Sequence, residues 1–546
     1  MTAPLDSAAA RNGAEAVDED GGTPDPGRRA RWARGTAAEI RARWRRLRWA
    51  RRARPIDGAP TGGRIIRPGW NCWRVAETAR AAVLVDGDQY FRHLETTLLR
   101  AQRSILIVGW DFDARIRLRP EADAKPLGQI LRELVEVRPE LEVRVLVWSL
   151  AVLHAPGAPW PLVLGAPWQA HPRIRVRLDR RHPLYGAHHQ KIVAVDDAVA
   201  FAGGMDLTVQ RWDTPEHLPD DPRRVDPDGT PYGAVHDVHM AVDGEAARAL
   251  SQIARNRWRV ATGETVPSVA VDGDPWPEAL APDFAGVDVA IARTAPPWGG
   301  EPRRREGIAM AESALLAARR SIYIEAQYLT ARRIGAVLAR RLGEPDGPEV
   351  VVVSTHSSRG LLEEFAMGTN RDRLIRKLRR HDRHGRLRAL YPVVCGADEG
   401  GRLLVHSKVV VIDDVFVRIG SSNFNNRSVG VDTECDLGIE AGDAAVRGAI
   451  AALRDRLLGE HLQVAPAVVG RTVDAAGGSL IAAIDRLNTG DRGLRAFAAM
   501  TSDGPTRPVC GTFLLDPETL IDPLWFLHRR RFAPRHAPAR PTAAAT

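Results

Sequence analysis

The sequence predicts an α/β fold made of two similar domains. Short apolar runs of about four to eight residues alternate with helical stretches, which is typical of a largely buried sheet. One phrase also occurs twice, at residues 189–196 and 406–413, and both copies read H-x-K-x4-D. The copies lie 217 residues apart, a period that indicates two long domains rather than a solenoid of short repeats.

The predicted elements follow the same order in both copies. A helix leads into an apolar strand, a second apolar run follows, and the motif then continues into a β-branched strand and a turn of small residues. The predicted helices are 90–103 and 307–320, the strands after them 105–108 and 322–324, and the second runs 143–150 and 349–354. The same offset aligns residues 98–105 with 315–322 and residues 203–206 with 420–423.

The duplication and the composition together predict the domain limits. We place the first domain at residues 61–285 and the second at 286–465. A basic arm, residues 1–60, precedes them, and a C-terminal extension, residues 466–546, follows them and ends in a disordered tail rich in Pro, Ala and Arg.

The motif concentrates a residue type that the chain otherwise avoids. Only four of its 77 basic residues are lysines, and Lys191 and Lys408 occupy the same place in the two motifs. A compact ammonium and a planar guanidinium are not equivalent at a phosphate. Lysine kept at these two positions therefore indicates chemistry on a phosphate ester.

Strand periodicity sorts the motif residues into two groups. If the motif begins a strand, His189 and Lys191 share one face, as do His406 and Lys408. The last motif residues, Asp196 and Asp413, stand at an odd offset from the histidines. We therefore interpret these two aspartates as structural members of the catalytic motif that cap a turn.

Other side chains must then orient the imidazoles and bind the phosphate. A working histidine has its second nitrogen fixed by a carboxylate or carbonyl, and Asp237 and Glu434 are the candidates for this role. Ser421 and Asn423, in the turn after the second motif, are candidates to hold phosphate oxygens. His236 and His239 would point to opposite faces of a strand, so we predict no metal site there.

These residues predict a reaction that needs no cofactor. If the two copies face each other, two histidines and two lysines converge on one phosphodiester. One histidine attacks phosphorus and forms a phosphohistidine, and the other protonates the leaving alkoxide and then activates water or an alcohol. The lysines supply the positive charge that a metal would otherwise provide. Because the two copies are nearly symmetric, these residues leave open which histidine is the nucleophile.

The duplicated motif resembles the signature of the phospholipase D superfamily. The resemblance covers roughly residues 70–465, and several phrases are similar to the phosphatidylcholine-hydrolysing branch and its bacterial relatives. They are residues 109–113 (GWDFD), 211–213 (RWD), 322–328 (IYIEAQY) and 420–428 (GSSNFNNRS). The resemblance implies two α/β/α layers about a pseudo-twofold axis, with the active site at the seam. It also implies that His189 is the nucleophile and His406 the acid and base.

Two departures from the family pattern concern the substrate. The usual E-N-Q-Y phrase has Ala326 in place of Asn. The first turn ends in Asp206 and lacks the Ser and Asn of the second turn, which favours a grip on the phosphate mainly from the second copy. Neither change touches the motif, so they bear on the head group rather than on catalysis.

The charge distribution favours a membrane surface over nucleic acid as the binding partner. Of the net charge of +9, residues 28–54 contribute twelve arginines and one acid, so the rest of the chain carries −2. A nuclease would need a basic track across its body. Ile40, Trp44 and Leu47 share a helical face among the arginines, which predicts an arm that lies on an anionic membrane.

The remaining features predict a cytoplasmic, peripherally membrane-associated monomer. The four cysteines have no metal or disulfide spacing, no apolar run is long enough to span a bilayer, and the acidic first twenty residues do not resemble a secretory signal. The leading hypothesis is a phospholipase D. The alternatives are a cardiolipin synthase, although the membrane helices usual in that group are not found here, then a nuclease, then a lipid-binding scaffold without activity.

Overall fold

A 16-stranded sheet runs through the part of the chain that the structure describes. The structure, a computed structural model, describes residues 63–520 except 122, 152–164, 358–363 and 395–402. All described residues lie in one compact unit of the chain, which begins at residue 59. The predicted basic arm and the residues after 520 lie outside the described residues.

The first half of the sheet contains the first motif. Its strand order is β4-β3-β2-β5-β6-β8-β1, in which β2, β3 and β4 are parallel and the other neighbours antiparallel. The strands are β1 (Arg74–Val85), β2 (Ser104–Gly109), β3 (Glu142–Trp148), β4 (Ile174–Asp179), β5 (Ile192–Val195), β6 (Val199–Gly203) and β8 (Val238–Asp243).

The second half repeats this order with the second motif. The order β13-β12-β11-β15-β16-β17-β9 again has three parallel strands followed by antiparallel ones, and β18 (Gly493–Ala496) is added beyond β13. The strands are β9 (Phe284–Ala295), β11 (Ser321–Ala326), β12 (Glu349–Ser354), β13 (Leu387–Val393), β15 (Lys408–Ile412), β16 (Phe416–Gly420) and β17 (Glu434–Glu440). A two-residue strand, β10 (Arg304–Arg305), pairs with β9.

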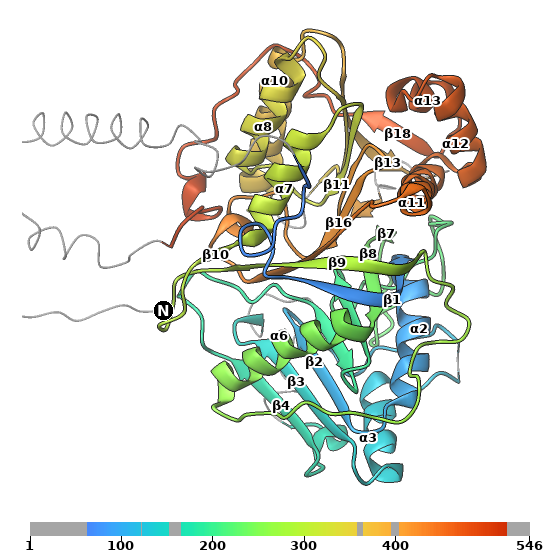
Figure 1. The fold of residues 1–546 in the computed structure, drawn as a ribbon, viewed down its shortest axis with the longest axis vertical. Coiled ribbons are helices and arrows are strands. Elements are labelled where there is room, and N and C mark those ends of the chain that lie inside the picture. The colour runs from blue at the N-terminus through green and yellow to red at the C-terminus, as the bar shows by residue number, and fades with distance from the viewer. Residues whose placement is uncertain (1–62, 122, 152–164, 358–363, 395–402, 521–546) are drawn as a thin grey trace, which may run out of the picture. The chain divides into compact units, whose positions relative to one another are not determined.

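The long strands β1 and β9 join the two halves. They pair antiparallel, with Ala76 opposite Val289, and run side by side in Figure 1. Each is also the last strand of its own half, β1 beside β8 and β9 beside β17. The strand order therefore reads the same from this joint outward in both directions, apart from the added β18.

Helices cover both faces of the sheet, so that the fold has three layers in the order α/β/α, as predicted. One face packs against α6 (Gly244–Thr262), α11 (Ala444–Leu462), α12 (Pro466–Ala475) and α13 (Leu480–Leu487) in one continuous apolar core. The other face packs against α2 (Asp86–Arg100) and α3 (Leu127–Val137) in the first half. In the second half it packs against α7 (Glu306–Ala317), α8 (Arg332–Gly343) and α10 (Thr369–His381).

The strands are apolar at successive positions because helices cover both of their faces. In β2, Ile105 and Ile107 face the core under α2 and α3, whereas Leu106 and Val108 face the core under α6. All six residues of β2 and of β11 are buried. A strand buried on both faces is apolar at successive positions and does not alternate.

The predicted elements differ from the observed ones mainly at their ends. The strand expected from His189 begins at Ile192 in the first copy and at Lys408 in the second. The predicted helix 90–103 is α2, which begins at Asp86, directly after β1. The domain limits remain a prediction. Within the described residues, no helix combines the length and the apolar character needed to cross a bilayer.

Candidate active site

Each motif histidine contacts a carboxylate from the other half of the chain. The Nδ1 atom of His189 lies 3.0 Å from Glu434 Oε2 and 3.0 Å from the carbonyl oxygen of Ser421. The Nδ1 atom of His406 lies 2.6 Å from Asp237 Oδ2. The structure thus brings both predicted histidines and both predicted orienting carboxylates together, in crossed pairs.

Short backbone pairings between the halves produce this crossing. The strand β7 (Val235–His236), just before Asp237, pairs in parallel with β14 (Leu404–Val405), just before His406. In the other half of the site, the backbone N–H of His189 donates to the carbonyl of Thr433, just before Glu434. Both crossed contacts are therefore fixed by main-chain hydrogen bonds as well as by side chains.

The neighbours of each Nδ1 atom determine the tautomer of the ring. His189 Nδ1 faces a carboxylate and a carbonyl, which only accept hydrogen bonds, so this nitrogen carries the hydrogen. His406 Nδ1 lies closer to Asp237 Oδ2, at 2.6 Å, than to the Lys408 ammonium, at 3.3 Å, so its hydrogen is directed at the carboxylate. Burial, with Lys191 and Lys408 nearby, lowers the pKa of His189 to about 3. Burial and Lys408 also lower the pKa of His406 well below its usual value. Both Nε2 atoms then carry a lone pair at neutral pH.

The two motif lysines have different surroundings. Lys191 Nζ lies 2.9 Å from Asp206 Oδ2, so a carboxylate already offsets its charge. Lys408 Nζ lies 3.3 Å from Gln327 Oε1 and 3.3 Å from His406 Nδ1. Burial lowers the pKa of Lys408 to about 7. The second lysine is therefore the more responsive of the two to an arriving anion.

The residues predicted to hold phosphate differ in what they offer. The Ser421 hydroxyl donates to Glu434 Oε2 at 2.5 Å and accepts from the backbone N–H of Cys435 at 3.0 Å, so its hydrogen is already in use. Ser421 thus supports the carboxylate that holds His189. The buried Asn423 amide has an oxygen without a hydrogen-bond partner in the described part of the chain.

A further serine completes the surroundings of Glu434. The Ser428 hydroxyl donates to Glu434 Oε1 at 2.7 Å. Burial nevertheless raises the pKa of Glu434 to about 7, against the lowering effect of the hydrogen bonds from Ser421 and Ser428. A carboxylate whose pKa is close to neutrality can accept a share of the His189 proton when the ring becomes positive.

The motif aspartates lie at the far end of their strands, in turns. Asp196 accepts the backbone N–H groups of Arg103 at 2.7 Å and Ser104 at 2.8 Å, and Asp413 accepts those of Arg320 at 2.8 Å and Ser321 at 2.7 Å. Among the described residues, neither aspartate forms a hydrogen bond or ion pair with a motif histidine or lysine. Their geometry is that of turn-capping residues at the start of β2 and β11.

Gly204, directly after β6, and Gly420, the last residue of β16, each allow a carboxylate to approach closely. A Cβ on Gly204 would collide with the Asp237 carboxylate, and one on Gly420 would collide with Asp436. Only a residue without a side chain leaves Asp237 where it contacts His406. This explains physically why a small-residue turn follows each motif.

Sequence reasoning did not assign three residues of the site. Asp206 pairs with Lys191, Gln327 contacts Lys408, and Ser428 supports Glu434. All three occur in phrases that the sequence analysis identified, and Asp206 aligns with Asn423 in the repeat. Their contacts lie between distant segments, which the phrases themselves do not specify.

Known proteins resemble this chain in sequence. Residues 312–449 match the family model described as the PLD-like domain of cardiolipin synthase. Phospholipase D B of Dictyostelium discoideum is 27% identical over a 215-residue alignment that covers 32% of this chain and 17% of that protein. Cardiolipin synthase of Halalkalibacterium halodurans is 26% identical over a 268-residue alignment that covers 46% of this chain and 42% of that protein. The chain thus matches less than half the length of either relative.

A solved structure resembles the fold over a longer stretch. The crystal structure of phosphatidylserine synthase from Haemophilus influenzae Rd KW20 superposes with a TM-score of 0.51 at 12% sequence identity. The match covers 74% of this chain and 96% of that one. At this identity the likeness concerns the fold alone.

Proposed function

From the premise that the chain is a member of the phospholipase D superfamily, we propose that it cleaves the head-group phosphodiester of glycerophospholipids. The phosphatidyl group passes to water, giving phosphatidic acid, or to an alcohol. The observation that carries the proposal is the crossed pair of neutral imidazoles, His189 held by Glu434 and His406 held by Asp237. Two buried lysines beside them offer the charge that a phosphodiester needs.

In the first step His189 acts as the nucleophile. Its Nε2 lone pair attacks phosphorus, a P–N bond forms, and the P–O bond to the head group breaks. The Glu434 carboxylate stabilises the imidazolium that develops, because the Nδ1–H already points at it. His406 donates its proton to the leaving alkoxide, for which the bound phosphate anion must first raise the pKa of this ring.

In the second step the intermediate is released. His406, now neutral, removes a proton from water or an alcohol, whose oxygen attacks phosphorus while the P–N bond breaks. Lys408 and Lys191 neutralise the negative charge on the non-bridging oxygens in both steps. The side-chain N–H groups of Asn423 are further candidate donors to one of these oxygens.

A cardiolipin synthase-type transfer is the second candidate. The family model that matches residues 312–449 carries that name, and a bacterial cardiolipin synthase is among the relatives that match this chain. In this reaction the acceptor alcohol is a second phospholipid. The two candidate reactions share the same chemistry and differ only in the acceptor that attacks phosphorus in the second step.

Vesicles that contain phosphatidylcholine and phosphatidylglycerol, with a short-chain alcohol added, test the proposal. We expect phosphatidic acid and the phosphatidyl-alcohol from the wild type, neither from His189→Ala, and both from His381→Ala, a control on the exposed end of α10. Cardiolipin as the main product would favour the second candidate. A wild type that releases no product from any phospholipid contradicts both.

A further inference from the structure

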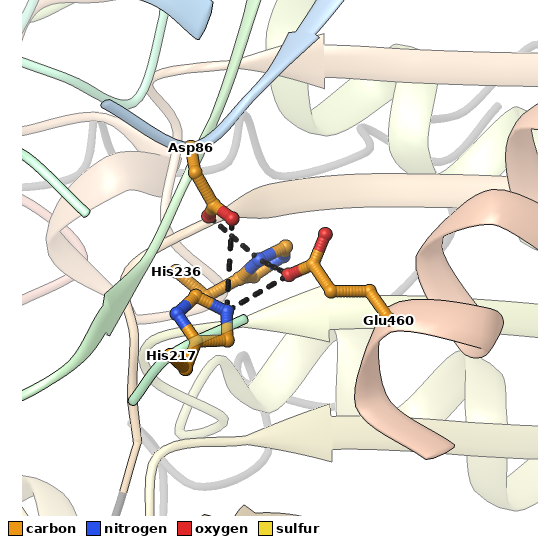
Figure 2. A group of neighbouring side chains, drawn as sticks. All are labelled: Asp86, His217, His236 and Glu460. Carbon is orange, nitrogen blue, oxygen red and sulfur yellow. Dashed lines mark hydrogen bonds and ion pairs between the residues drawn. The ribbon is translucent and has the colours of Figure 1, made fainter. Parts of the chain in front are cut away.

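Two histidines and two carboxylates form a buried cluster that the proposed reaction does not use. Asp86 begins α2, His217 lies in the loop after β6, His236 ends β7, and Glu460 lies in the last turn of α11. Figure 2 shows the four side chains pointing toward one another. The side chains are at most 5% exposed, and one ligand atom from each lies within 4.8 Å of the others.

The four donors alternate between nitrogen and oxygen around a small space. His236 Nδ1 lies 2.6 Å from Glu460 Oε1 and 3.1 Å from Asp86 Oδ1. His217 Nε2 lies 3.0 Å from Glu460 Oε1 and 3.6 Å from Asp86 Oδ2. A tetrahedral ion with bonds of about 2.0–2.2 Å separates its donors by about 3.3–3.5 Å. Movements of less than about 1 Å would therefore admit such an ion.

Two atoms in the cluster lack the hydrogen bonds that burial demands. His236 Nδ1 is close to two carboxylate oxygens, yet its ring N–H is directed at neither well enough to form a hydrogen bond. Asp86 Oδ2 also has no hydrogen-bond partner within the described ranges. Both residues are fully buried, and a buried polar atom without a partner costs about 1–3 kcal/mol. A cation that accepts both lone pairs removes this cost.

The far nitrogen of each histidine is held as metal ligands usually are. His217 Nδ1 lies 2.9 Å from Asp213 Oδ2, and His236 Nε2 lies 2.9 Å from Glu325 Oε2. A carboxylate on the far nitrogen fixes the tautomer, turns the lone pair of the other nitrogen inward and makes it more basic. Both histidines thus aim an unprotonated nitrogen at the same space when the cluster holds a cation.

We propose that Asp86, His217, His236 and Glu460 bind a divalent transition-metal cation, with Zn²⁺ the best match. Two imidazoles favour Zn²⁺ over the hard cations Mg²⁺ and Ca²⁺, and four protein donors suit its tetrahedral geometry. Two carboxylates offset the charge of the ion. Because four protein side chains fill the coordination sphere, the site is structural rather than catalytic.

The position of the cluster gives the cation a mechanical role. The bound cation would link α11 of the second half to α2 and β7 of the first half. The residue after His236 is Asp237, which holds His406, and the carbonyl of His236 accepts the backbone N–H of His406 at 2.8 Å. A cation bound to His236 thus stabilises the segment that orients one catalytic histidine. The inference does not depend on which phospholipid is the substrate.

The sequence did not predict this site. The spacing of His236 and His239 excluded a metal between those two residues, and His239 instead stacks on Tyr90, with ring centroids 4.1 Å apart. The alternative to a metal is a pair of imidazolium ions between the carboxylates. Its net charge equals that of two neutral imidazoles with a divalent cation, so charge does not distinguish the two states.

Metal analysis of the full-length wild type decides between them. Protein produced in zinc-containing medium and washed free of loosely held ions should retain about one equivalent of metal per chain by elemental analysis. Native mass spectrometry should show the same mass addition, lost on denaturation. Protein made with Co²⁺ in place of Zn²⁺ should show the visible absorption of a tetrahedral site. Metal-free protein in all three measurements overturns the proposal in favour of the ion pairs.

Matched variants locate the ion. Glu460→Gln keeps the side-chain shape but weakens a ligand, and it should lower Zn²⁺ affinity at least about tenfold in competition with a chelator. Glu440→Gln, at the end of β17, is the control and should retain the affinity of the wild type. Equal affinity in the two variants places any metal elsewhere and overturns the proposal. If Glu460→Gln does not fold, the measurements on the wild type still decide.

Discussion

At the scale of single residues, the site depends on which atom carries each proton. Glu434 and Asp237 keep hydrogen on the Nδ1 atoms, so that the Nε2 atoms of His189 and His406 are available for chemistry. The same burial that lowers the pKa of both histidines lowers the pKa of Lys408 to about 7. Two predictions follow from these protonation states.

Replacement of Glu434 by Gln should slow the first chemical step. A Gln amide can turn an N–H toward His189 Nδ1, which moves the ring hydrogen to Nε2 and removes the attacking lone pair. We expect a loss of between about 10²- and 10⁴-fold in the single-turnover rate of phosphoenzyme formation. Glu440→Gln, on the same strand, is the control. A rate within a few-fold of the wild type would mean that Glu434 does not set the tautomer.

Lys408 should make stability depend on pH. In the folded chain Lys408 holds its proton up to about pH 7, because burial lowers its pKa, whereas the ordinary pKa of a lysine is 10.5. Between these values the unfolded chain binds the extra proton, so a rise in pH stabilises the fold, by at most about 1.4 kcal/mol per pH unit. Urea unfolding at pH 7, 8 and 9 should show this rise in wild type relative to Lys408→Met. A constant difference between the two proteins contradicts the prediction.

At the scale of elements, the turns after β6 and β16 hold the orienting carboxylates close to the motif strands. The Gly203-Gly204 turn passes against Asp237, and β7, which delivers Asp237, pairs with β14, which delivers His406. The sheet therefore positions the proposed catalytic groups through its turns and short strands, while the long strands join the two halves.

A methyl group on Gly204 should damage activity more than stability. The added Cβ meets the Asp237 carboxylate, which must move away from His406. A displacement of about 1 Å in a catalytic group can cost about 10²-fold in rate. Gly233→Ala, two residues before β7 and with open space around its Cβ position, is the control. Both variants are compared by kcat and by thermal unfolding, and equal kcat values would contradict the role given to Gly204.

At the scale of the whole molecule, the two halves complete one site together. The contact of His189 with Glu434 joins residues 245 positions apart, and that of His406 with Asp237 joins residues 169 apart. The pairing of β1 with β9 fixes the halves in one sheet. The role of the basic arm as a membrane anchor stays a prediction, because the arm lies outside the described residues.

Removal of residues 1–58 should separate membrane binding from chemistry. Twelve arginines among residues 28–54 leave with the arm, and each contributes about 1 kcal/mol near an anionic surface. We expect weaker sedimentation with anionic vesicles and unchanged turnover of a short-chain phospholipid below its micelle concentration. Neutral vesicles serve as the control. Equal sedimentation of the full and shortened chains would contradict a membrane role for the arm.

The sequence by itself determined the fold class and predicted the chemistry. The duplicated H-x-K-x4-D phrase and the apolar runs are local signals, and strand periodicity separated His189 and Lys191 from Asp196 without a structure. Tertiary structure decided which carboxylate serves which histidine, that Ser421 supports Glu434, and that His236 meets Glu460. These contacts join segments whose approach depends on how the two halves pack, and no local pattern encodes that packing.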